Sequence, residues 1–151
     1  MKKILLNSCV ISALLMAASV SYAGCSVPTK VSGLYLNNGN GTVTDNETGL
    51  MWAQCTDGLS DAACATGVAS TNTWAAAFAV VKAANTASLM GYNDWRLPNV
   101  KELLSIVDKG CDSPAINVTI FPATQLGGYW SSSPAKQDNQ AAYSVDFSVG
   151  S

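Results

Sequence analysis

The segment GYNDWRLPNVKELLSIVD, from Gly91 to Asp108, constrains the fold more than any other part of the sequence. Residues 95–97 suit an extended strand, and Pro98 keeps the residue before it out of the helical region of backbone space. Asn99 is suited to begin a helix, with Glu102 at the spacing of a capping box. The segment therefore predicts a strand, a sharp corner and a short helix, whose apolar face is formed by Val100, Leu103, Leu104 and Val107.

Asp94 and Arg96 are the charged pair of this segment with the potential for chemistry. Catalysis would require a nucleophile or a paired acid, which the segment does not offer. We therefore expect Asp94 and Arg96 to form an ion pair that fixes the corner between the strand and the helix. Trp95, Leu97 and Pro98 are expected to be structural as well.

The N-terminus has the pattern of an export signal. Lys2 and Lys3 precede an apolar run that ends near Ala18, and Ser21 and Ala23 are the small residues that signal peptidase recognises. The run is shorter than the roughly 20 apolar residues that span a bilayer. We therefore expect a signal peptide over residues 1–23 that is not part of the fold, a mature domain over residues 24–151, and no transmembrane segment.

The predicted location is outside the cytoplasm, either secreted or in the periplasm or at the cell surface. The stretch YAGC raises a second possibility, a lipoprotein signal in which Cys25 is acylated. Tyr22 occupies the position where such signals usually carry an aliphatic residue, so soluble export is favoured.

Cleavage after residue 23 leaves four cysteines, an even number that suits disulfides in an oxidising compartment. Only eight residues separate Cys55 from Cys64, and a local disulfide would close them into a surface loop, leaving Cys25 and Cys111 as the second pair. Metal binding is disfavoured, because the chain has no histidine and lacks the paired CxxC spacing of zinc sites. No metal and no cofactor is expected.

Length and charge narrow the class of protein. Removing 23 of the 151 residues leaves 128, enough for one domain with its own core. Without Lys2 and Lys3 the basic residues fall from 8 to 6 against 10 acidic ones, a net charge of −4. This balance argues against nucleic acid as a partner, because such binding needs clustered lysine or arginine.

Short β-prone runs at 34–36, 42–44 and 50–53 alternate with Asn, Gly and Asp clusters, which predicts a β-meander. Met51 and Trp52 point to opposite faces of the last run, so one of them is expected in the core.

A helix is predicted over residues 73–88, with Thr71 or Asn72 as its N-cap and an apolar stripe of Trp74, Phe78 and Val81. Near the C-terminus, Tyr143, Val145 and Phe147 alternate with polar residues, as in a half-buried strand. Together with the strand at Tyr129 and Trp130 they predict a hairpin with a long loop.

The blocks NGNGTVTDNETGLMW, TWAAAFAVVKAAN, GYNDWRLPNVKELLSIVD, PAIN with IFPAT, YWSSSP and AYSVDFSVG occur in this order. In this combination the chain resembles the Lcl C-terminal domain family over about 125 residues, from Cys25 to the end. The resemblance implies a C-type-lectin-like α+β fold, with two helices on a small twisted antiparallel sheet and paired N- and C-terminal strands. Within these blocks we expect structural roles for Trp52, Trp74, Trp95, Arg96, Leu97, Pro98 and Trp130.

The chain departs from the family pattern in two ways. Its lysines and its arginine form no basic strip, so the sulfated-glycan binding of the adhesin that gives the family its name is not carried over. Relatives usually continue into a closing strand, whereas this sequence stops at Ser151. We therefore expect the C-terminal strand to be missing, either by truncation of the gene or as an open sheet edge.

The resemblance implies an exported, adhesin-like binding module without catalytic activity, whose partner is a glycan, as in carbohydrate-binding domains, or an extracellular protein. The candidate ligand-binding residues are Tyr129, Gln137, Asp138 and Asn139, whereas Trp130 is expected in the core. The alternatives are a structural or assembly subunit of the envelope and, less favoured, an oxidase-like enzyme on a related fold. The absence of histidine argues against iron-dependent and Ser-His-Asp chemistry. Calcium could use the oxygen-rich turn at 45–47, but turn formation explains those residues equally well.

Overall fold

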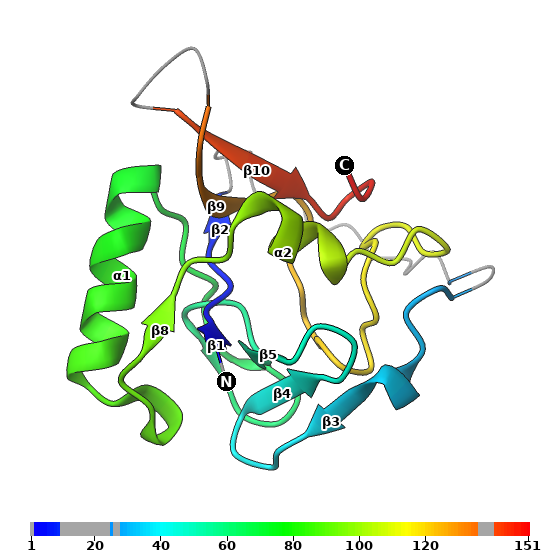
Figure 1. Cartoon of the computed structure of the whole chain (residues 1–151), viewed down its shortest axis with the longest axis horizontal. Coiled ribbons are helices and arrows are strands. Elements are labelled where there is room, and N and C mark those ends of the chain that lie inside the picture. Colours follow the sequence, from blue (N-terminus) through cyan, green and yellow to red (C-terminus); the bar gives the residue numbers. More distant parts are fainter. Residues whose placement is uncertain (1, 10–24, 26–27, 136–140) are drawn as a thin grey trace.

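The computed structural model describes residues 2–9, 25, 28–135 and 141–151. Within these residues the fold is α+β, as expected, with two α-helices and three sheets (Figure 1). The helices are α1 (Trp74–Thr86) and α2 (Val100–Ser105), and short 3-10 turns lie at η1 (Ser32–Leu34) and η2 (Leu89–Gly91). The strands are β1 (Lys2–Ile4), β2 (Ser8–Cys9), β3 (Tyr35–Asn37), β4 (Thr42–Asp45), β5 (Leu50–Ala53), β6 (Leu59–Ser60), β7 (Thr66–Gly67), β8 (Trp95–Arg96), β9 (Gly128–Pro134) and β10 (Ala142–Asp146).

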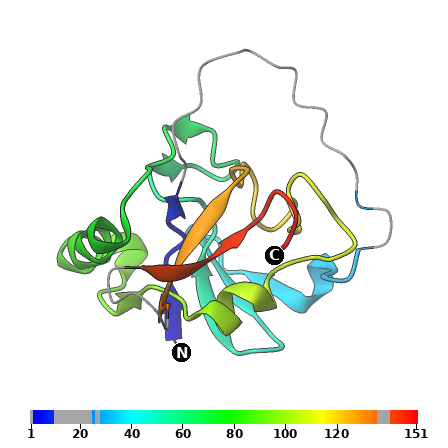
Figure 2. The ribbon, with the colours of Figure 1, turned by 90° about the horizontal axis from the view of Figure 1, so that it is seen from above.

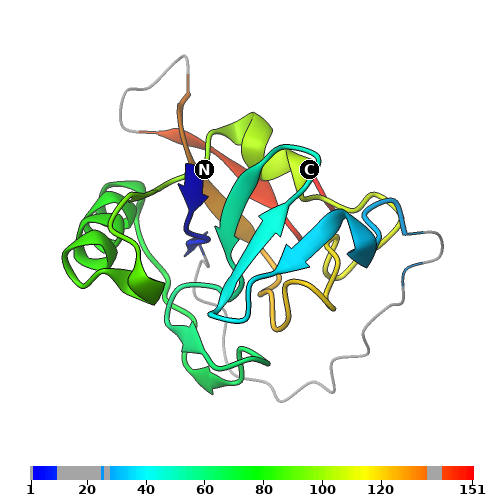
Figure 3. The ribbon, with the colours of Figure 1, turned by 60° about the horizontal axis from the view of Figure 1, so that its bottom comes forward.

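The predicted β-meander is confirmed. Strands β3, β4 and β5 pair in sequence order and antiparallel, and they lie side by side in Figure 3. The side chain of Asn37 accepts a hydrogen bond from the Gly39 amide in the first turn, and Gly39 and Gly41 both have positive φ. Asp45 accepts hydrogen bonds from the backbone and hydroxyl of Thr48 in the second turn. Local turn chemistry thus fixes this part of the sheet.

The N-terminal residues lie inside the fold, whereas the sequence analysis placed them outside it. Strand β1 lies between β5 and β8 and runs parallel to both, so the largest sheet has the order β3-β4-β5-β1-β8. The sheet is therefore mixed, and the expectation of a purely antiparallel sheet is wrong. The edge of β5 is not open, because β1 pairs with it. Cleavage after Ala23 stays a prediction.

The predicted C-terminal hairpin is confirmed by the antiparallel pair of β9 and β10. The other edge of β9 pairs with β2, which gives the order β10-β9-β2 (Figure 2). The pairing of N- and C-terminal strands that the resemblance implied is not seen among the described strands after residue 24, because β3 pairs with β4 and β10 pairs with β9. Val145 and Phe147 are buried, but Tyr143 is exposed.

Helix α1 begins one residue later than the sequence suggested, because the Thr73 side chain accepts a hydrogen bond from the Ala76 amide and caps it. Its buried residues are Ala77 and Val81, which are four positions apart on one face. Phe78 lies about 100° further round the helix and is 46% exposed, so its predicted core position is wrong.

Helix α2 has the predicted capping box, since Asn99 and Glu102 each accept a hydrogen bond from the other residue's backbone amide. Leu103 is fully buried, and Val107 just beyond the helix is buried too. Leu104 is 43% exposed, contrary to the prediction, because the short helix turns this position toward solvent.

Two apolar clusters lie on opposite faces of the large sheet. Trp52 and Ile4 belong to the first cluster, which extends to α2 and the β9–β10 hairpin. Leu5 and Ala53 belong to the second cluster, which lies under α1. Because both faces of the sheet are covered, Met51 and Trp52 are both buried, and the expectation that only one of them would be is wrong.

Disulfides link Cys25 to Cys111 and Cys55 to Cys64, as the sequence predicted. The second disulfide closes a loop that contains β6, and β7 follows this loop directly and pairs with β6. Within the described residues, no helix combines the length and the apolar character that crossing a membrane requires.

Candidate functional site

A groove with a volume of about 410 Å³ opens between three loops, and we call it the amide groove. One wall is the turn between β3 and β4, the second is the start of the Cys55–Cys64 loop, and the third is η2. Its lining includes Asn37, Asn40, Gly41, Gln54, Asp61 and Met90. These loops come from separate parts of the chain, so the groove is created by the fold.

The first wall is held by side-chain amides that bond to their own turn. Asn40 accepts hydrogen bonds from both the amide and the hydroxyl of Thr42, at 3.2 and 2.6 Å. The backbone amide of Gln54 donates to the carbonyl of Gly41 at 2.9 Å, which joins the turn to the end of β5. These bonds leave the turn little freedom to move.

The second wall is fixed by Asp61 and by the disulfide beside it. The Asp61 carboxylate accepts hydrogen bonds from the Thr66 hydroxyl at 2.6 Å and from the amides of Ala63 and Ala65 at 2.7 and 3.2 Å. These bonds, with the Thr66 hydroxyl first, lower the pKa of Asp61 below its usual value. Asp61 is therefore ionised at neutral pH, with its oxygen atoms directed into its own loop.

The third wall has an unusual backbone. Ser88 and Met90 have φ values of 49° and 54°, in the left-handed region that residues other than glycine rarely adopt. The conformation is held by the indole of Trp95 and the amide of Tyr92, which both donate to the carbonyl of Leu89 at 3.0 Å. A Cβ added at Gly41 would lie 3.2 Å from the Met90 methyl carbon, so Met90 packs closely on the first wall.

Gln54 is the residue of the amide groove with hydrogen-bonding capacity to spare. The residue is 6% exposed, its side-chain amide bonds to no other described residue, and neither amide atom is fully enclosed, because the enclosed side-chain atoms without a partner belong to Asn7 and Trp52. An accessible amide of this kind can exchange its hydrogen bonds to water for hydrogen bonds to a ligand, with the modest net gain of free energy that is usual for such an exchange. Beside it, Leu89 and Met90 offer apolar surface, so the groove combines polar and apolar contacts.

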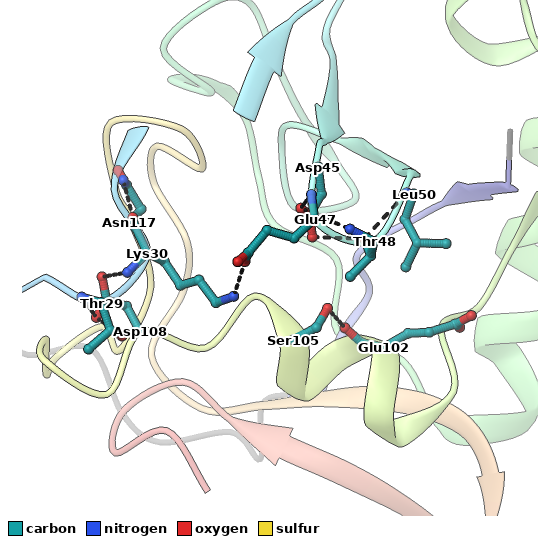
Figure 4. Close-up of polar contacts among 10 residues, drawn as sticks. All are labelled: Thr29, Lys30, Asp45, Glu47, Thr48, Leu50, Glu102, Ser105, Asp108 and Asn117. Atoms are coloured by element: carbon teal, nitrogen blue, oxygen red, sulfur yellow. Dashed lines mark hydrogen bonds and ion pairs between the residues drawn. The ribbon is translucent and has the colours of Figure 1, made fainter. Parts of the chain in front are cut away.

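A larger cavity, of about 570 Å³, lies between the β4–β5 turn and α2 and is bordered by Lys2 and Lys101. Figure 4 shows that Thr48, Glu102 and Ser105 of its lining already take part in hydrogen bonds. Thr48 donates to Asp45, and the Ser105 hydroxyl donates to the Glu102 carbonyl at 2.7 Å. We consider this cavity a weaker candidate, because Lys2 belongs to the predicted signal peptide.

Cys25, Asp108 and Cys111 lie close enough to hold a metal ion, but each already has another role. The two cysteines form a disulfide. Asp108 accepts hydrogen bonds from the amide and hydroxyl of Thr29, both at 2.8 Å, and from the amide of Lys30 at 3.0 Å (Figure 4). It also accepts one from the amide of Gly110 at 3.0 Å. Fully bonded carboxylate oxygens beside a disulfide are a structural arrangement.

The predicted ion pair between Asp94 and Arg96 is wrong. Asp94 accepts a hydrogen bond from Lys3 at 2.8 Å, because β1 lies next to β8. Arg96 forms a two-pronged contact with Glu102, at 2.7 and 2.8 Å. The Arg96 hydrogen bond is the largest cause that lowers the pKa of Glu102. Both pairs are structural, and the corner is fixed by Arg96 and Glu102.

The candidate ligand-binding residues do not gather into one site. Tyr129 is 1% exposed, and its hydroxyl lies 2.7 Å from that of Thr56 and accepts a hydrogen bond from the Gln125 amide. Tyr129 is thus a core residue, and its prediction as a ligand contact is wrong. Residues 137–139 (Gln137, Asp138 and Asn139) lie outside the described residues.

The tryptophans of the predicted structural set have such roles. Trp52 and Trp95 are buried. Trp74 and Trp130 are half-buried and donate their indole N–H groups to the backbone carbonyls of Ser131 and Asn72. Leu97 and Pro98 are buried as well.

The amide groove was not predicted from the sequence. Its walls consist of common turn residues, and nothing in the local pattern around Gln54 distinguishes it from any other polar residue after a strand. The positive φ values of Ser88 and Met90 are also invisible in sequence, because the favoured residues at such positions are Gly and Asn.

The fold and the groove define a disulfide-bonded α+β domain with a rigid, loop-lined surface site. The family model of the Lcl C-terminal domain matches residues 41–151. The chain therefore belongs to the Lcl C-terminal domain family, in agreement with the resemblance of its sequence blocks. No curated protein and no solved structure matches the chain.

Proposed function

We propose that the protein is an exported, non-catalytic binding module whose ligand is a glycan without sulfate groups, bound in the amide groove. The observation that carries this proposal is the side-chain amide of Gln54, which lines the groove, bonds to no other described residue and is accessible to a ligand. A sugar ring has hydroxyl groups that pair with an amide and C–H faces that pack on apolar side chains such as Met90. The cavity volume lies within the range of small-ligand sites.

The charge of the protein supports a neutral glycan over a sulfated one. The chain from residue 24 onward has a net charge of −4, and the acidic residue in the groove, Asp61, is ionised at neutral pH. An anionic ligand would be repelled from this surface.

The roles of the carboxylates support a function without catalysis. Asp61 and Asp108 accept hydrogen bonds from their own loops, and Glu102 is bound to Arg96. In each case the contacts hold the carboxylate in its charged form, which suits a structural part better than a general acid. The chain also has no histidine to serve as a base.

The test is a screen of the oxidised full chain on an array of neutral and sulfated glycans, followed by calorimetry with the best ligand. Gln54→Met removes both hydrogen-bonding groups at nearly constant volume, and we expect it to weaken binding about tenfold or more. The matched control is Gln125→Met, at a half-buried position outside the groove. Equal affinities of the two variants, or binding to sulfated glycans alone, would contradict the proposal.

A further inference from the structure

The segment Lys2–Cys9, which we call the N-terminal strand segment, connects the two main sheets of the molecule. Its first part is β1, between β5 and β8, and its last part is β2, on the edge of β9. Between these strands the Leu5 amide donates to the Arg96 carbonyl, and the carbonyls of Leu6 and Asn7 accept from the amides of Asp57 and Trp130. Backbone hydrogen bonds therefore follow the segment along its length.

The side chains in the middle of the segment, residues 4–7, are among the most deeply buried of the described residues. Ile4, Leu5, Leu6 and Asn7 are each at most 2% exposed. Ile4 and Leu6 belong to the cluster on one face of the sheet, and Leu5 belongs to the cluster on the other. Among the described strands, β8 has no strand partner other than β1, so removal of the segment would separate β8 from the sheet.

The segment does not satisfy every polar group around it. In the described part of the chain, two buried side-chain nitrogen atoms lack a hydrogen-bond partner, Nδ2 of Asn7 and Nε1 of Trp52. Asn7 belongs to the segment, and the backbone of Trp52 pairs with Ile4. Unsatisfied buried groups of this kind cost stability. The space between β5 and β8 thus accommodates this strand but does not satisfy all of its polar groups and those of its neighbours.

The same residues carry the pattern of a signal peptide, and the two roles exclude each other. Hydrolysis of the bond between Ala23 and Gly24 by a signal peptidase consumes one water, leaves a carboxylate on Ala23 and an amine on Gly24, and detaches the segment. We propose that the position of the N-terminal strand segment is a strand-acceptor site, which in the exported protein takes a β-strand from a second polypeptide.

The chemistry of the site specifies this strand. It runs parallel to β5 and β8, and it presents three consecutive aliphatic side chains where Ile4, Leu5 and Leu6 lie, because both faces are covered. Before them comes a cationic residue that reaches Asp94, as Lys3 does. This inference goes beyond the proposed glycan site, which lies in a different part of the molecule.

The test begins with the full chain carrying a protease cleavage sequence within residues 10–24. The folded, oxidised protein is cut there and unfolded in urea without reduction, the released N-terminal fragment is removed by gel filtration in urea, and the remaining chain is refolded with an excess of a fluorescent peptide of residues 2–9 in which Cys9 is replaced by Ser. We expect the native near-ultraviolet circular dichroism to return with one labelled peptide per chain on gel filtration. A matched peptide with Ile4→Asp and Leu6→Asp should be taken up at least about tenfold less, because it would bury two charges.

Two results would overturn the acceptor site. One is refolding that proceeds equally well with no peptide or with the double-Asp peptide, and the other is refolding that succeeds only in the uncut chain. Intact-mass spectrometry of the protein exported by a bacterial host tests whether the segment is removed on export and replaced by a strand of another polypeptide. We expect a chain that begins at Gly24 and co-purifies with a second polypeptide, whereas a chain that retains residues 1–9 would refute the exchange.

Discussion

At the scale of single residues, the carboxylates of this protein hold the backbone in place. Asp108 is the clearest case, since it is fully buried and accepts four hydrogen bonds from Thr29, Lys30 and Gly110. Burial alone would raise the pKa of Asp108, but these hydrogen bonds outweigh it and keep the pKa below its usual value. The charged form of Asp108 therefore ties residues 29–30 to the region after α2.

Asp108→Asn should destabilise the protein at pH 7 by about 1.5–3 kcal/mol, the usual contribution of hydrogen bonds to a charged group. Because the pKa of Asp108 is lower in the folded protein, its contribution is complete above the unfolded pKa of about 4 and declines as pH falls below it. Urea unfolding at pH 7 and at about pH 3 should show the gap between variant and wild type narrowing at the lower pH. Asp112→Asn, at an exposed position, is the control, and a gap independent of pH would refute this account.

The contact between Arg96 and Glu102 predicts that lysine cannot replace Arg96 without cost. Arg96→Lys loses the two parallel hydrogen bonds and should cost about 1 kcal/mol in urea unfolding, since the pair is partly exposed. Glu102→Gln keeps an acceptor for the Asn99 amide but weakens the contact with Arg96. If the two residues act as a pair, the double variant should lose no more free energy of unfolding than the two single variants lose together. The reference is Lys101→Arg, at an exposed position. If Arg96→Lys changes the free energy of unfolding no more than this reference does, Arg96 has no structural role.

At the scale of secondary-structure elements, the features encoded locally could be predicted from the sequence. The capping box of α2 depends on two residues three positions apart, and the β3–β4–β5 turns depend on Asn, Asp and Gly at fixed positions. The partner of Asp94 could not be predicted, because Lys3 is 91 residues away and reaches it only through the pairing of β1 with β8. Phe78 was misplaced for a related reason, since periodicity gives a face of α1 only to within about one residue.

The two disulfides should differ in their contribution to stability. Cys25 and Cys111 are 86 residues apart in sequence, whereas Cys55 and Cys64 are 9 apart. In the loop-entropy model, replacing both cysteines by serine should cost about 4–5 kcal/mol for the first pair and about 2–3 kcal/mol for the second. Urea unfolding under non-reducing conditions measures both values. The reverse order of stabilities would show that loop entropy is not the dominant effect.

At the scale of the whole molecule, the arrangement depends on the N-terminal strand segment, whose side chains pack into the apolar clusters on both faces of the large sheet. The residues KKILLNSC fit a signal peptide and a doubly buried strand equally well, because both require consecutive apolar residues after a charged start. Sequence alone could not place them between β5 and β8. The amide groove was hidden for a similar reason, because its three walls meet only after the sheet and α1 have assembled.

The two-faced strand predicts that neighbouring residues act independently. Ile4→Val should cost about 0.5–1.5 kcal/mol and Leu5→Ala about 2–5 kcal/mol in urea unfolding of the full chain, because each leaves a space in a packed cluster. These clusters lie on opposite faces, so the double variant should equal the sum to within about 0.5 kcal/mol although the residues are adjacent. Leu36→Ala, at an exposed site in β3, should change stability by no more than about 0.5 kcal/mol. A loss of stability for Leu5→Ala as small as that for Leu36→Ala would mean that the N-terminal strand segment is not part of the stable core. A departure from additivity above about 1 kcal/mol in the double variant would mean that the two faces belong to a single core.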